Sequence, residues 1–481
     1  MAQVQQREAM MAFATGTKQQ ALAVLRLSGE GVLQTLEKMF VPGKKENSSN
    51  VPLKLLPRHA YFGRLLDPLD RSVIDEVVLI YFQAPNSYTG EDLVEISLHG
   101  SKAVCQKALA VFEAQGLRLA EPGEFTRRAF YNGKMDLLQA EAVEELIQSQ
   151  SDLARQSALT RLRGGLSARV EALEADLYYI LSQLEVAIAY PEYEEFEPDL
   201  SHLIEQFAHL EQQASALLSG YQKSRWMQEG IRVALMGPSN AGKSSLFNAL
   251  LGYERAIVTD IAGTTRDTIE GLIDVEGLEF RLIDTAGFRE SEDLVEQIGM
   301  KRSEAAMKEA DAVFWLFPLD MDESEWQIQL EAALSARKQT DARLIAVLSK
   351  MDLDQKGRAK ALKEQLEAHQ FEVLLCHQGD ELPLDVQHSE GLKMIHETLL
   401  LWARSLKGDT VDALIANERQ AQILRQLLKQ LGQIKHDLNV LPIDIVSQAL
   451  KACLEQLAQM TGKQVTEQLL SELFSHFCVG K

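Results

Sequence analysis

The sequence lacks the features that mark secreted, metal-stapled or membrane-spanning proteins. Its 481 residues include only four cysteines, and none of them forms a Cys-x-x-Cys pair, so neither a zinc site nor a disulfide framework is indicated. No apolar run approaches the roughly 18 residues that span a bilayer, and the first residues lack a basic region followed by an apolar stretch. We therefore expect a cytoplasmic protein without a membrane segment.

Positive charge is also in short supply. The 49 Lys and Arg residues are outnumbered by 70 Asp and Glu residues, which gives a formal net charge of -21. Non-specific attachment to nucleic acid or to an anionic membrane is driven by positive potential and is therefore disfavoured. An RNA partner would have to meet local basic patches, unless the candidate residues form only a solvated helix face. These candidates are Arg127, Arg128, Arg161 and Arg163.

Helical patterns flank the middle of the chain on both sides. Short apolar runs at 21–29 and 76–82 predict strands of an N-terminal α/β or α+β domain. Apolar residues then recur at steps of three and four between 166 and 188, and again between 424 and 438 before Pro442 interrupts the pattern. This predicts a helical domain that is discontinuous in sequence, with the middle region inserted into it. The expected domains are 1–121, the helical 122–229 and 401–481, and the inserted 230–400.

The inserted region begins with a phosphate-binding motif. The segment RVALMGPSNAGKSSLFNALLG places G-x-x-x-x-G-K-S, from Gly237 to Ser244, between an apolar strand and an amphipathic helix. Gly237 and Gly242 allow backbone amides to turn inward around the phosphates. Lys243 would reach the β- and γ-phosphates, and the Ser244 hydroxyl would ligate Mg²⁺. Ser245 and the N-terminus of the helix complete the expected site.

Two downstream loops contain residues expected to respond to the γ-phosphate. One of Thr264 and Thr265, in TDIAGTTRD, should close on Mg²⁺ and the γ-phosphate. Asp284, at the end of the strand LEFRLID, would hold Mg²⁺ through water, and the Gly287 amide would sense the γ-phosphate. The pattern predicts loops that become ordered with a triphosphate and are released after hydrolysis.

A base-recognition motif follows the apolar strand RLIAVL. In Ser349-Lys350-Met351-Asp352, the Asp352 carboxylate can accept two hydrogen bonds from guanine, and the stem of Lys350 can cover the ring. Guanine is therefore favoured over adenine. Ser349 stands where this motif usually has Asn, so we expect a weaker grip on the base. Asp385-Val386-Gln387 is a second departure, because a loop of the Ser-Ala-Lys type is expected there.

The residue that positions the attacking water is not the Gln of small regulatory GTPases. Phe288 follows the Asp-Thr-Ala-Gly segment, and its side chain cannot hydrogen-bond water. Asn240 could place an amide oxygen near the phosphates, where a monovalent cation would replace an arginine finger. Nearby carboxylates are further candidates, although most are expected to form a solvated segment. They are Glu290, Glu292, Asp293 and Glu296.

Longer segments add a resemblance to a known family. They are LRLSG, PNSYTGEDLVEISLHG, EPGEFTRRAFYNGKMDLLQAEAVEELI, TDIAGTTRD and the terminal FCVGK. With the GTPase motifs, they make the chain resemble the MnmE (TrmE) family of tRNA-modification GTPases along nearly its whole length. The resemblance implies a multidomain α/β plus all-α fold. A Ras-like P-loop G domain with a parallel sheet would be inserted in a discontinuous helical domain, behind an N-terminal α+β domain that binds folate and dimerises.

The resemblance also implies roles for individual residues. Glu296 would be the catalytic carboxylate that orients water through a bridging water, and Cys478 matches a near-terminal cysteine of the family. The Mg²⁺ ligands would be Ser244 and Thr265, and the K⁺ ligands Asn240, Thr259, Ile261 and Thr264. The folate site would comprise Arg26, Glu95, Lys134 and Lys481. GTP contacts would come from Asn240, Ala241, Gly242, Lys243, Ser244, Ser245, Thr259, Asp260, Ile261, Ala262, Gly263, Thr264, Thr265, Asp284, Thr285, Ala286, Gly287, Ser349, Lys350 and Asp352.

The function implied by the resemblance is a potassium-dependent GTPase that acts as a homodimer. With the flavoprotein MnmG, it would transfer a one-carbon unit from a tetrahydrofolate derivative to carbon 5 of a tRNA wobble uridine, giving an aminomethyl or carboxymethylaminomethyl group. GTP hydrolysis, with Mg²⁺ and K⁺, would gate the conformational cycle. Two other interpretations stay open: a GTP-regulated switch for RNA or ribosome assembly, and a weakly nucleotide-binding scaffold for MnmG.

Overall fold

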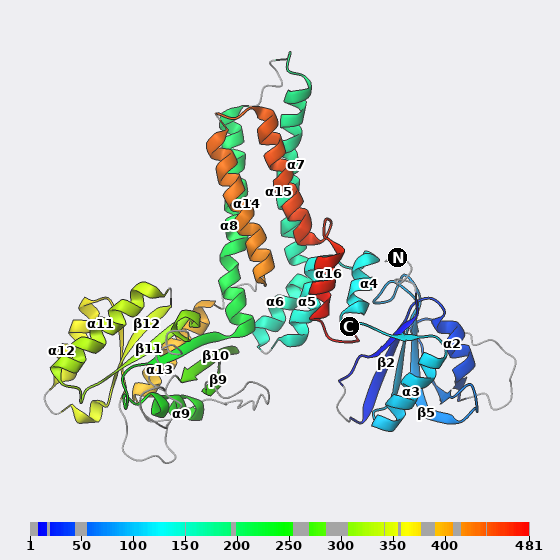
Figure 1. Cartoon of the computed structure of the whole chain (residues 1–481), viewed down its shortest axis with the longest axis horizontal. Coiled ribbons are helices and arrows are strands. Elements are labelled where there is room, and N and C mark those ends of the chain that lie inside the picture. The colour runs from blue at the N-terminus through cyan, green and yellow to red at the C-terminus, as the bar shows by residue number, and fades with distance from the viewer. Residues whose placement is uncertain are drawn as a thin grey trace. The chain divides into compact units, whose positions relative to one another are not determined.

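The structure is a computed structural model that divides into two compact units (Figure 1). The first comprises Met1–Ile147, Arg161–Ala214 and Gln422–Lys481, and the second Gln148–Thr160 and Ser215–Ala421. No helix in the part of the chain that the structure describes is long and apolar enough to cross a membrane. The described residues are 8–16, 20–43, 55–149, 151–193, 199–253, 269–284, 306–340, 342–354, 357–376, 390–406, 415–438 and 440–480.

The first unit contains a seven-stranded sheet of order β3-β4-β5-β6-β2-β1-β7. Its strands are β1 (Met10–Phe13), β2 (Leu22–Ser28), β3 (Phe40–Pro42), β4 (Ala60–Leu66), β5 (Val73–Phe82), β6 (Leu93–His99) and β7 (Arg118–Leu119). Helices α2 (Val32–Met39) and α3 (Lys102–Ala114) contribute Leu36 and Phe112 to the same apolar core as Leu25 and Ile96 of the sheet. The strands expected at 21–29 and 76–82 are confirmed as β2 and β5.

Helices make up the rest of the first unit. They are α4 (Glu124–Tyr131), α5 (Leu137–Gln148), α7 (Gly165–Ala189), α15 (Ile443–Thr461) and α16 (Glu467–Ser475), with parts of α6 (Asp152–Leu162), α8 (Leu200–Glu229) and α14 (Glu418–Asp437). Leu173 and Leu177 of α7 are fully buried, as are Leu450 and Leu457 of α15, and the two helices pack side by side (Figure 1). The long helices expected from the apolar spacing are confirmed, including the break at Pro442.

The second unit is a six-stranded sheet of order β13-β12-β11-β8-β10-β9, in which only β9 pairs antiparallel to its neighbour. Its strands are β8 (Ile231–Met236), β9 (Ile269–Val275), β10 (Leu278–Asp284), β11 (Ala312–Pro318), β12 (Arg343–Ser349) and β13 (Glu372–Leu375). Parallel strands end at one edge of a sheet, and ligands of such folds bind there. The ends of β8, β10 and β12, which precede the predicted nucleotide motifs, therefore meet at this edge.

Helices cover both faces of this second sheet. Helices α9 (Lys243–Tyr253) and α13 (Glu390–Leu406) join one core, represented by Phe247 and Ile395. Helices α11 (Glu323–Gln339) and α12 (Arg358–Ala368) join the other, represented by Trp326 and Leu366. A parallel sheet covered on both faces needs strands that are apolar on both sides, and β11, AVFWLFP, is buried at every position. This is the architecture of a P-loop α/β domain.

Candidate functional site

The phosphate loop joins β8 to α9 and has a backbone that glycine permits. Gly237 has φ 137, and a Cβ placed there would lie 2.6 Å from the carbonyl oxygen of Leu316, which is too close for any side chain. Gly242 has φ 92. Asn240 lies between them with φ 62, a left-handed conformation that Asn adopts more readily than most residues, and its side chain is exposed. The loop therefore has the tight turn that its motif predicts.

Lys243 folds back over this loop. Its Nζ donates hydrogen bonds to the carbonyl oxygens of Gly237 and Pro238, at 2.9 and 2.8 Å, and the residue is only 8% exposed. Lys243 is also the first residue of α9, and Ser244 and Ser245 follow with exposed side chains. An ammonium, helix N-terminal amides and hydroxyls are thus collected at one helix N-terminus, which is a favourable environment for phosphate.

The base motif contacts the phosphate loop directly. The Ser349 hydroxyl, at the end of β12, donates to the carbonyl oxygen of Ala241 over 2.8 Å. Lys350 follows with φ 59, and its Nζ forms an ion pair with Asp320 Oδ2 at 2.5 Å. The backbone of Asp352 lies in the short 3₁₀ helix Met351–Leu353. Two motifs that are about a hundred residues apart in the sequence therefore meet at the carboxyl edge of the sheet.

A cavity of about 330 Å³ borders both loops. Asn240 and Lys350 both line it, with Asp320, which precedes α11, and Glu325 of α11. The complete lining is Pro238, Ser239, Asn240, Pro318, Asp320, Met321, Glu325, Ile328, Gln329 and Lys350. The exposed Asn240 side chain is thus accessible from the rim of this cavity.

Many residues implied by the family resemblance lie outside the described residues. These are Thr259, Asp260, Ile261, Ala262, Gly263, Thr264, Thr265, Thr285, Ala286, Gly287, Glu296 and Lys481, together with Phe288, the other acidic candidates and Asp385-Val386-Gln387. Asp284 is described through its backbone, which ends β10 and pairs in register with Leu235 of β8. The backbone of Asp284 therefore lies on the strand next to β8, which leads into the phosphate loop.

Arg26 and Glu95 form a second polar site, on the sheet of the first unit. They face each other in register on β2 and β6, and Glu95 Oε1 accepts from Nε and Nη2 of Arg26 at 3.0 and 2.7 Å. Arg26 Nη1 donates to the carbonyl oxygen of Gly480 at 3.1 Å, which places Gly480 at this pair. The guanidinium also lies over the rings of Tyr88 and Phe125, 5.4 and 5.7 Å from their centroids.

Lys134 has a different partner from Arg26. Its Nζ donates to the carbonyl oxygen of Pro85 at 2.9 Å. A Cβ on Gly90 would come within 3.3 Å of the Lys134 side chain, so Lys134 lies over the 85–90 turn. Three of the four residues of the expected folate set are thus on the described chain, and two of them contact each other.

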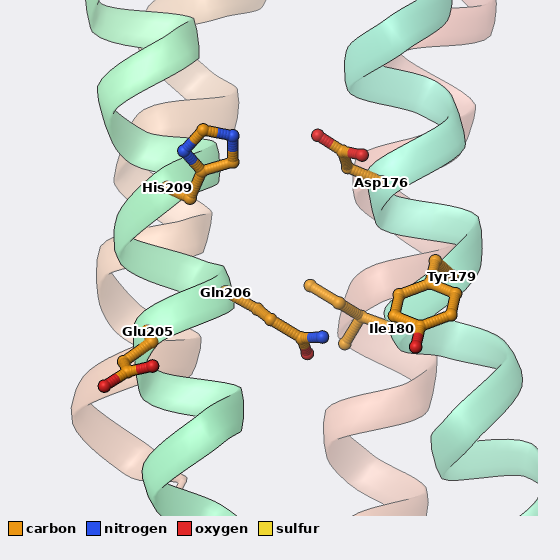
Figure 2. A pocket seen from close by; sticks show the side chains of 6 residues that line it. All are labelled: Asp176, Tyr179, Ile180, Glu205, Gln206 and His209. Atoms are coloured by element: carbon orange, nitrogen blue, oxygen red, sulfur yellow. The ribbon is translucent and has the colours of Figure 1, made fainter.

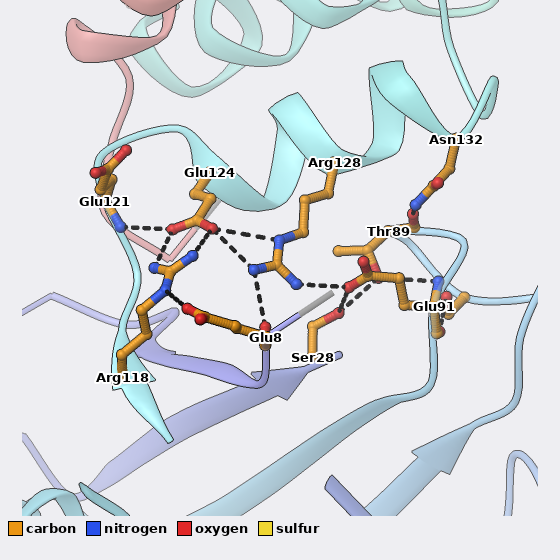
Figure 3. A network of polar contacts seen from close by, with 10 residues as sticks. Glu8, Ser28, Thr89, Glu91, Arg118, Glu121, Glu124, Arg128 and Asn132 are labelled. Atoms are coloured by element: carbon orange, nitrogen blue, oxygen red, sulfur yellow. Dashed lines mark hydrogen bonds and ion pairs between the residues drawn. The ribbon is translucent and has the colours of Figure 1, made fainter. Parts of the chain in front are cut away.

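Arg128 is the centre of a buried ion network that the sequence did not reveal (Figure 3). It donates to Glu124 Oε1 at 2.9 Å, to Glu91 Oε2 at 3.0 Å and to the carbonyl oxygen of Glu8 at 2.9 Å, and it is 2% exposed. Arg118 donates to both carboxylate oxygens of Glu124, so it shares Oε1 with Arg128. The network connects helix α4 with the sheet of the first unit.

Glu124 is strongly stabilised as a carboxylate within this network. Burial by itself would raise the pKa of Glu124, but hydrogen bonds from Arg118 and the Glu121 amide, with the charge of Arg128, lower it to about 2. The segment EPGEFTRRAF contains Glu124 and Arg128 four residues apart, as on one helix face, so their pairing was accessible from spacing. Their burial was not.

The suggestion of a basic patch at four arginines is wrong for two of them. Arg128 and Arg161 are 2% and 1% exposed, and Arg161 is bound to Glu145 at 2.6 Å. Arg127 pairs with Glu121, and Arg163 is exposed. Buried, paired guanidinium groups cannot contact RNA phosphates, so no patch of these four residues exists on the surface.

A further cavity of about 350 Å³ lies between α7 and α8 in the first unit (Figure 2). Its lining residues are Asp176, Tyr179, Ile180, Glu205, Gln206 and His209. Asp176 accepts a hydrogen bond from Gln213 at 3.0 Å. None of the sequence motifs maps to this cavity.

Comparisons with known proteins match nearly the whole chain. Residues 9–134 match the family model described as the GTP-binding protein TrmE N-terminus, and residues 137–478 match that of the MnmE helical domain. Proteins called tRNA modification GTPase MnmE are 34% identical in Carboxydothermus hydrogenoformans and 37% in Aquifex aeolicus. The matches cover 98% and 99% of this chain, and 99% and 100% of those proteins. The G domain of the T. maritima FeoB iron transporter is 24% identical over 36% of this chain and 98% of its own, with a TM-score of 0.27.

Proposed function

The chain belongs to the MnmE family of tRNA modification GTPases, and on that premise we propose that it hydrolyses GTP to support modification of the tRNA wobble uridine in the cytoplasm. The observation that carries the proposal is the meeting of two loops. Lys243 lies in the phosphate loop, and Ser349 of the base motif is hydrogen-bonded to that loop. One nucleotide can therefore contact both loops, its phosphates at the start of α9 and its base beside Lys350 and Asp352.

The phosphate loop supplies groups that suit Mg²⁺ and a triphosphate. Ser244 presents a hydroxyl at the start of α9, and Asp284 ends the strand beside β8. Hydroxyl and carboxylate oxygens are the ligands that Mg²⁺ prefers, with Thr265 as the further ligand that the family implies. When bound, the ion would neutralise charge on the β- and γ-phosphates. Lys243 would hold those phosphates and the helix amides would orient them.

We assign hydrolysis to a potassium-assisted mechanism, as the family resemblance implies. The Asn240 side chain is exposed beside the phosphate loop, where its amide oxygen can face a cation. Thr264 and the carbonyl oxygens at Thr259 and Ile261 would complete the K⁺ site. The ion would supply positive charge next to the phosphates, the task of an arginine finger in other GTPases. Glu296 would orient the attacking water.

The N-terminal sheet is proposed to bind the tetrahydrofolate derivative. Arg26 and Glu95 offer donors and acceptors beside the rings of Tyr88 and Phe125, a combination that suits a flat, polar, aromatic ligand. Lys481 follows Gly480, whose carbonyl contacts Arg26. With Lys134, this set would hold the cofactor, which supplies the one-carbon unit. MnmG, tRNA and a second copy of the chain are the proposed partners.

The proposed domain limits follow the same scheme. The folate-binding and dimerisation domain is 1–121, the G domain is 230–400, and the helical domain combines 122–229 with 401–481. This division differs from the two compact units, in which the N-terminal sheet and most of the helical bundle fall together.

The proposal is tested by GTP turnover in potassium and in sodium. We expect turnover that requires potassium and is lost in Asn240→Ala and Glu296→Ala, while the matched acidic control Glu290→Ala keeps it. Lys243→Ala should abolish nucleotide binding itself. Cation-independent or absent turnover by the wild type would contradict the mechanism and favour a GTP-regulated assembly switch or a scaffold. Folate binding that is lost in Arg26→Ala would separate the enzyme from both, since neither alternative needs folate.

A further inference from the structure

We propose that the Ser349 hydroxyl positions the base motif against the phosphate loop, and that this single hydrogen bond sets both the affinity and the guanine preference of the nucleotide site. The inference rests on the proposed nucleotide site and names a residue within it. Ser349 occupies the position at which GTPase base motifs usually have Asn. The hydroxyl takes over the contact between loops through its bond to Ala241, called here the inter-loop hydrogen bond.

The inter-loop hydrogen bond is short and shielded from water. Ser349 Oγ and the Ala241 carbonyl oxygen are 2.8 Å apart, and the two residues are 5% and 1% exposed. A hydrogen bond in a low-dielectric interior is electrostatically stronger than one in water, because no solvent competes for either group. The bond joins residues separated by 108 positions, so neither loop can form it alone.

Ser349 provides a fixed point because the sheet holds its backbone. It pairs in register with Pro318 of β11, and its carbonyl oxygen accepts from the Leu319 amide at 3.1 Å. The preceding carbonyl, of Leu348, accepts from the Cys376 amide at 2.8 Å. With strands on both sides, Ser349 has little freedom to move, so its hydroxyl determines where the phosphate loop is held.

The phosphate loop needs such a contact at Ala241. The residues on either side, Asn240 and Gly242, have φ 62 and 92, so the backbone is in the left-handed region both before and after Ala241. In a trans peptide the carbonyl and the following amide point in opposite directions. Holding the Ala241 carbonyl toward Ser349 therefore turns the Gly242 N–H away from it, the direction in which a loop amide can serve a phosphate.

The base side of the contact is held at a second point. Lys350, directly after Ser349, forms an ion pair with Asp320 at 2.5 Å, and its side chain is 19% exposed. The backbone then enters the 3₁₀ helix that contains Asp352. Ser349 and Lys350 together fix where this helix begins, so the inter-loop hydrogen bond determines where the backbone of Asp352 lies relative to the phosphate loop.

The test compares GDP and inosine diphosphate binding in matched variants. Inosine lacks the 2-amino group, which would donate a hydrogen bond to a carboxylate at Asp352, so the ratio of the two affinities reports base recognition. Ser349→Ala should bind GDP about fivefold to tenfold more weakly than the wild type, which is the effect of losing one buried hydrogen bond. The ratio of its affinities for GDP and inosine diphosphate should also be smaller than in the wild type. Ser335→Ala, an exposed serine of α11, should bind both as the wild type does.

A rescue variant distinguishes positioning from simple stability. Ser349→Asn restores a donor of the usual kind and should bind GDP at least as tightly as the wild type. A serine that only stabilised the fold would lower the thermal midpoint of the nucleotide-free protein without changing the GDP preference of the folded fraction. Wild-type affinity and preference in Ser349→Ala would overturn the inference. If Ser349→Ala does not fold, GDP binding by Ser349→Asn that is weaker than that of the wild type would overturn the inference instead. A wild type that binds neither nucleotide would refute the proposed nucleotide site itself.

Discussion

Replacing Glu124 with Gln should destabilise the first unit specifically. The side chain is 2% exposed, and its carboxylate lies between Arg118 and Arg128 (Figure 3). Glu124→Gln keeps the shape of the side chain but removes the charge that compensates the two guanidinium groups. A pKa of about 2 in place of 4.5 corresponds to about 3 kcal/mol of stability at neutral pH.

The destabilisation of Glu124→Gln relative to the wild type should depend on pH in a definite direction. A carboxyl whose pKa is lowered by folding contributes fully above its unfolded value, near 4.5, and loses that contribution as the pH falls toward about 2. The difference in unfolding free energy between the wild type and Glu124→Gln should therefore be greatest near pH 7. It should shrink between about pH 4.5 and 2.

The positions of the tryptophans separate the two units in one experiment. All four, Trp226, Trp315, Trp326 and Trp402, belong to the second unit. In urea, far-UV circular dichroism should show an earlier transition for Glu124→Gln, while the tryptophan fluorescence transition stays where the wild type has it. Glu121→Gln is the matched control, because the Glu121 side chain is 63% exposed in its pair with Arg127 and such pairs contribute little. Equal unfolding of Glu124→Gln and wild type at pH 7, or a difference that does not shrink in acid, would refute the reasoning.

Two substitutions test the local geometry elsewhere. Gly237→Ala should weaken GDP binding about tenfold or more, because a Cβ at φ 137 would lie 2.6 Å from the Leu316 carbonyl oxygen. The control is Gly252→Ala in α9, where an added Cβ would meet no neighbouring atom. This variant should bind GDP as the wild type does in the same titration. Leu450→Ala, fully buried in α15 where it packs on α7, should lower the unfolding free energy by about 2 to 5 kcal/mol in denaturant titrations followed by circular dichroism, and a loss below about 1 kcal/mol would contradict that packing.

Patterns that repeat along the chain predicted the elements well. Apolar steps of three and four gave the long helices of the first unit, and Pro442 marked the division between α14 and α15 because proline cannot continue a helix. The strand, loop and helix around Gly237 also follow from local residues, since glycines at fixed spacing decide which turn the backbone can make. These predictions succeeded because each depends on residues within one or two turns of one another.

Predictions about surfaces and partners were less secure. Arg128 and Arg161 look like surface cations in the sequence, yet both are buried among carboxylates. Ser349 departs from the usual Asn of the base motif, and the sequence did not show that its hydroxyl reaches the phosphate loop. Composition shows which charges a chain has, but the fold decides which of them meet water.

The sequence by itself determined the order of elements, the phosphate and base motifs and the family, because these depend on local spacing and on residue identity. Only the tertiary structure decided that Ser349 contacts Ala241, that Arg26 reaches Gly480, and that Glu124 lies between two arginines. The first two contacts join residues 108 and 454 positions apart. The position of the Glu124 carboxylate between the two arginines depends on its burial, which the spacing of residues in the sequence does not show. Such properties exist only after the hydrophobic cores have brought distant strands and helices together, since that packing fixes which polar groups lose water and must find one another.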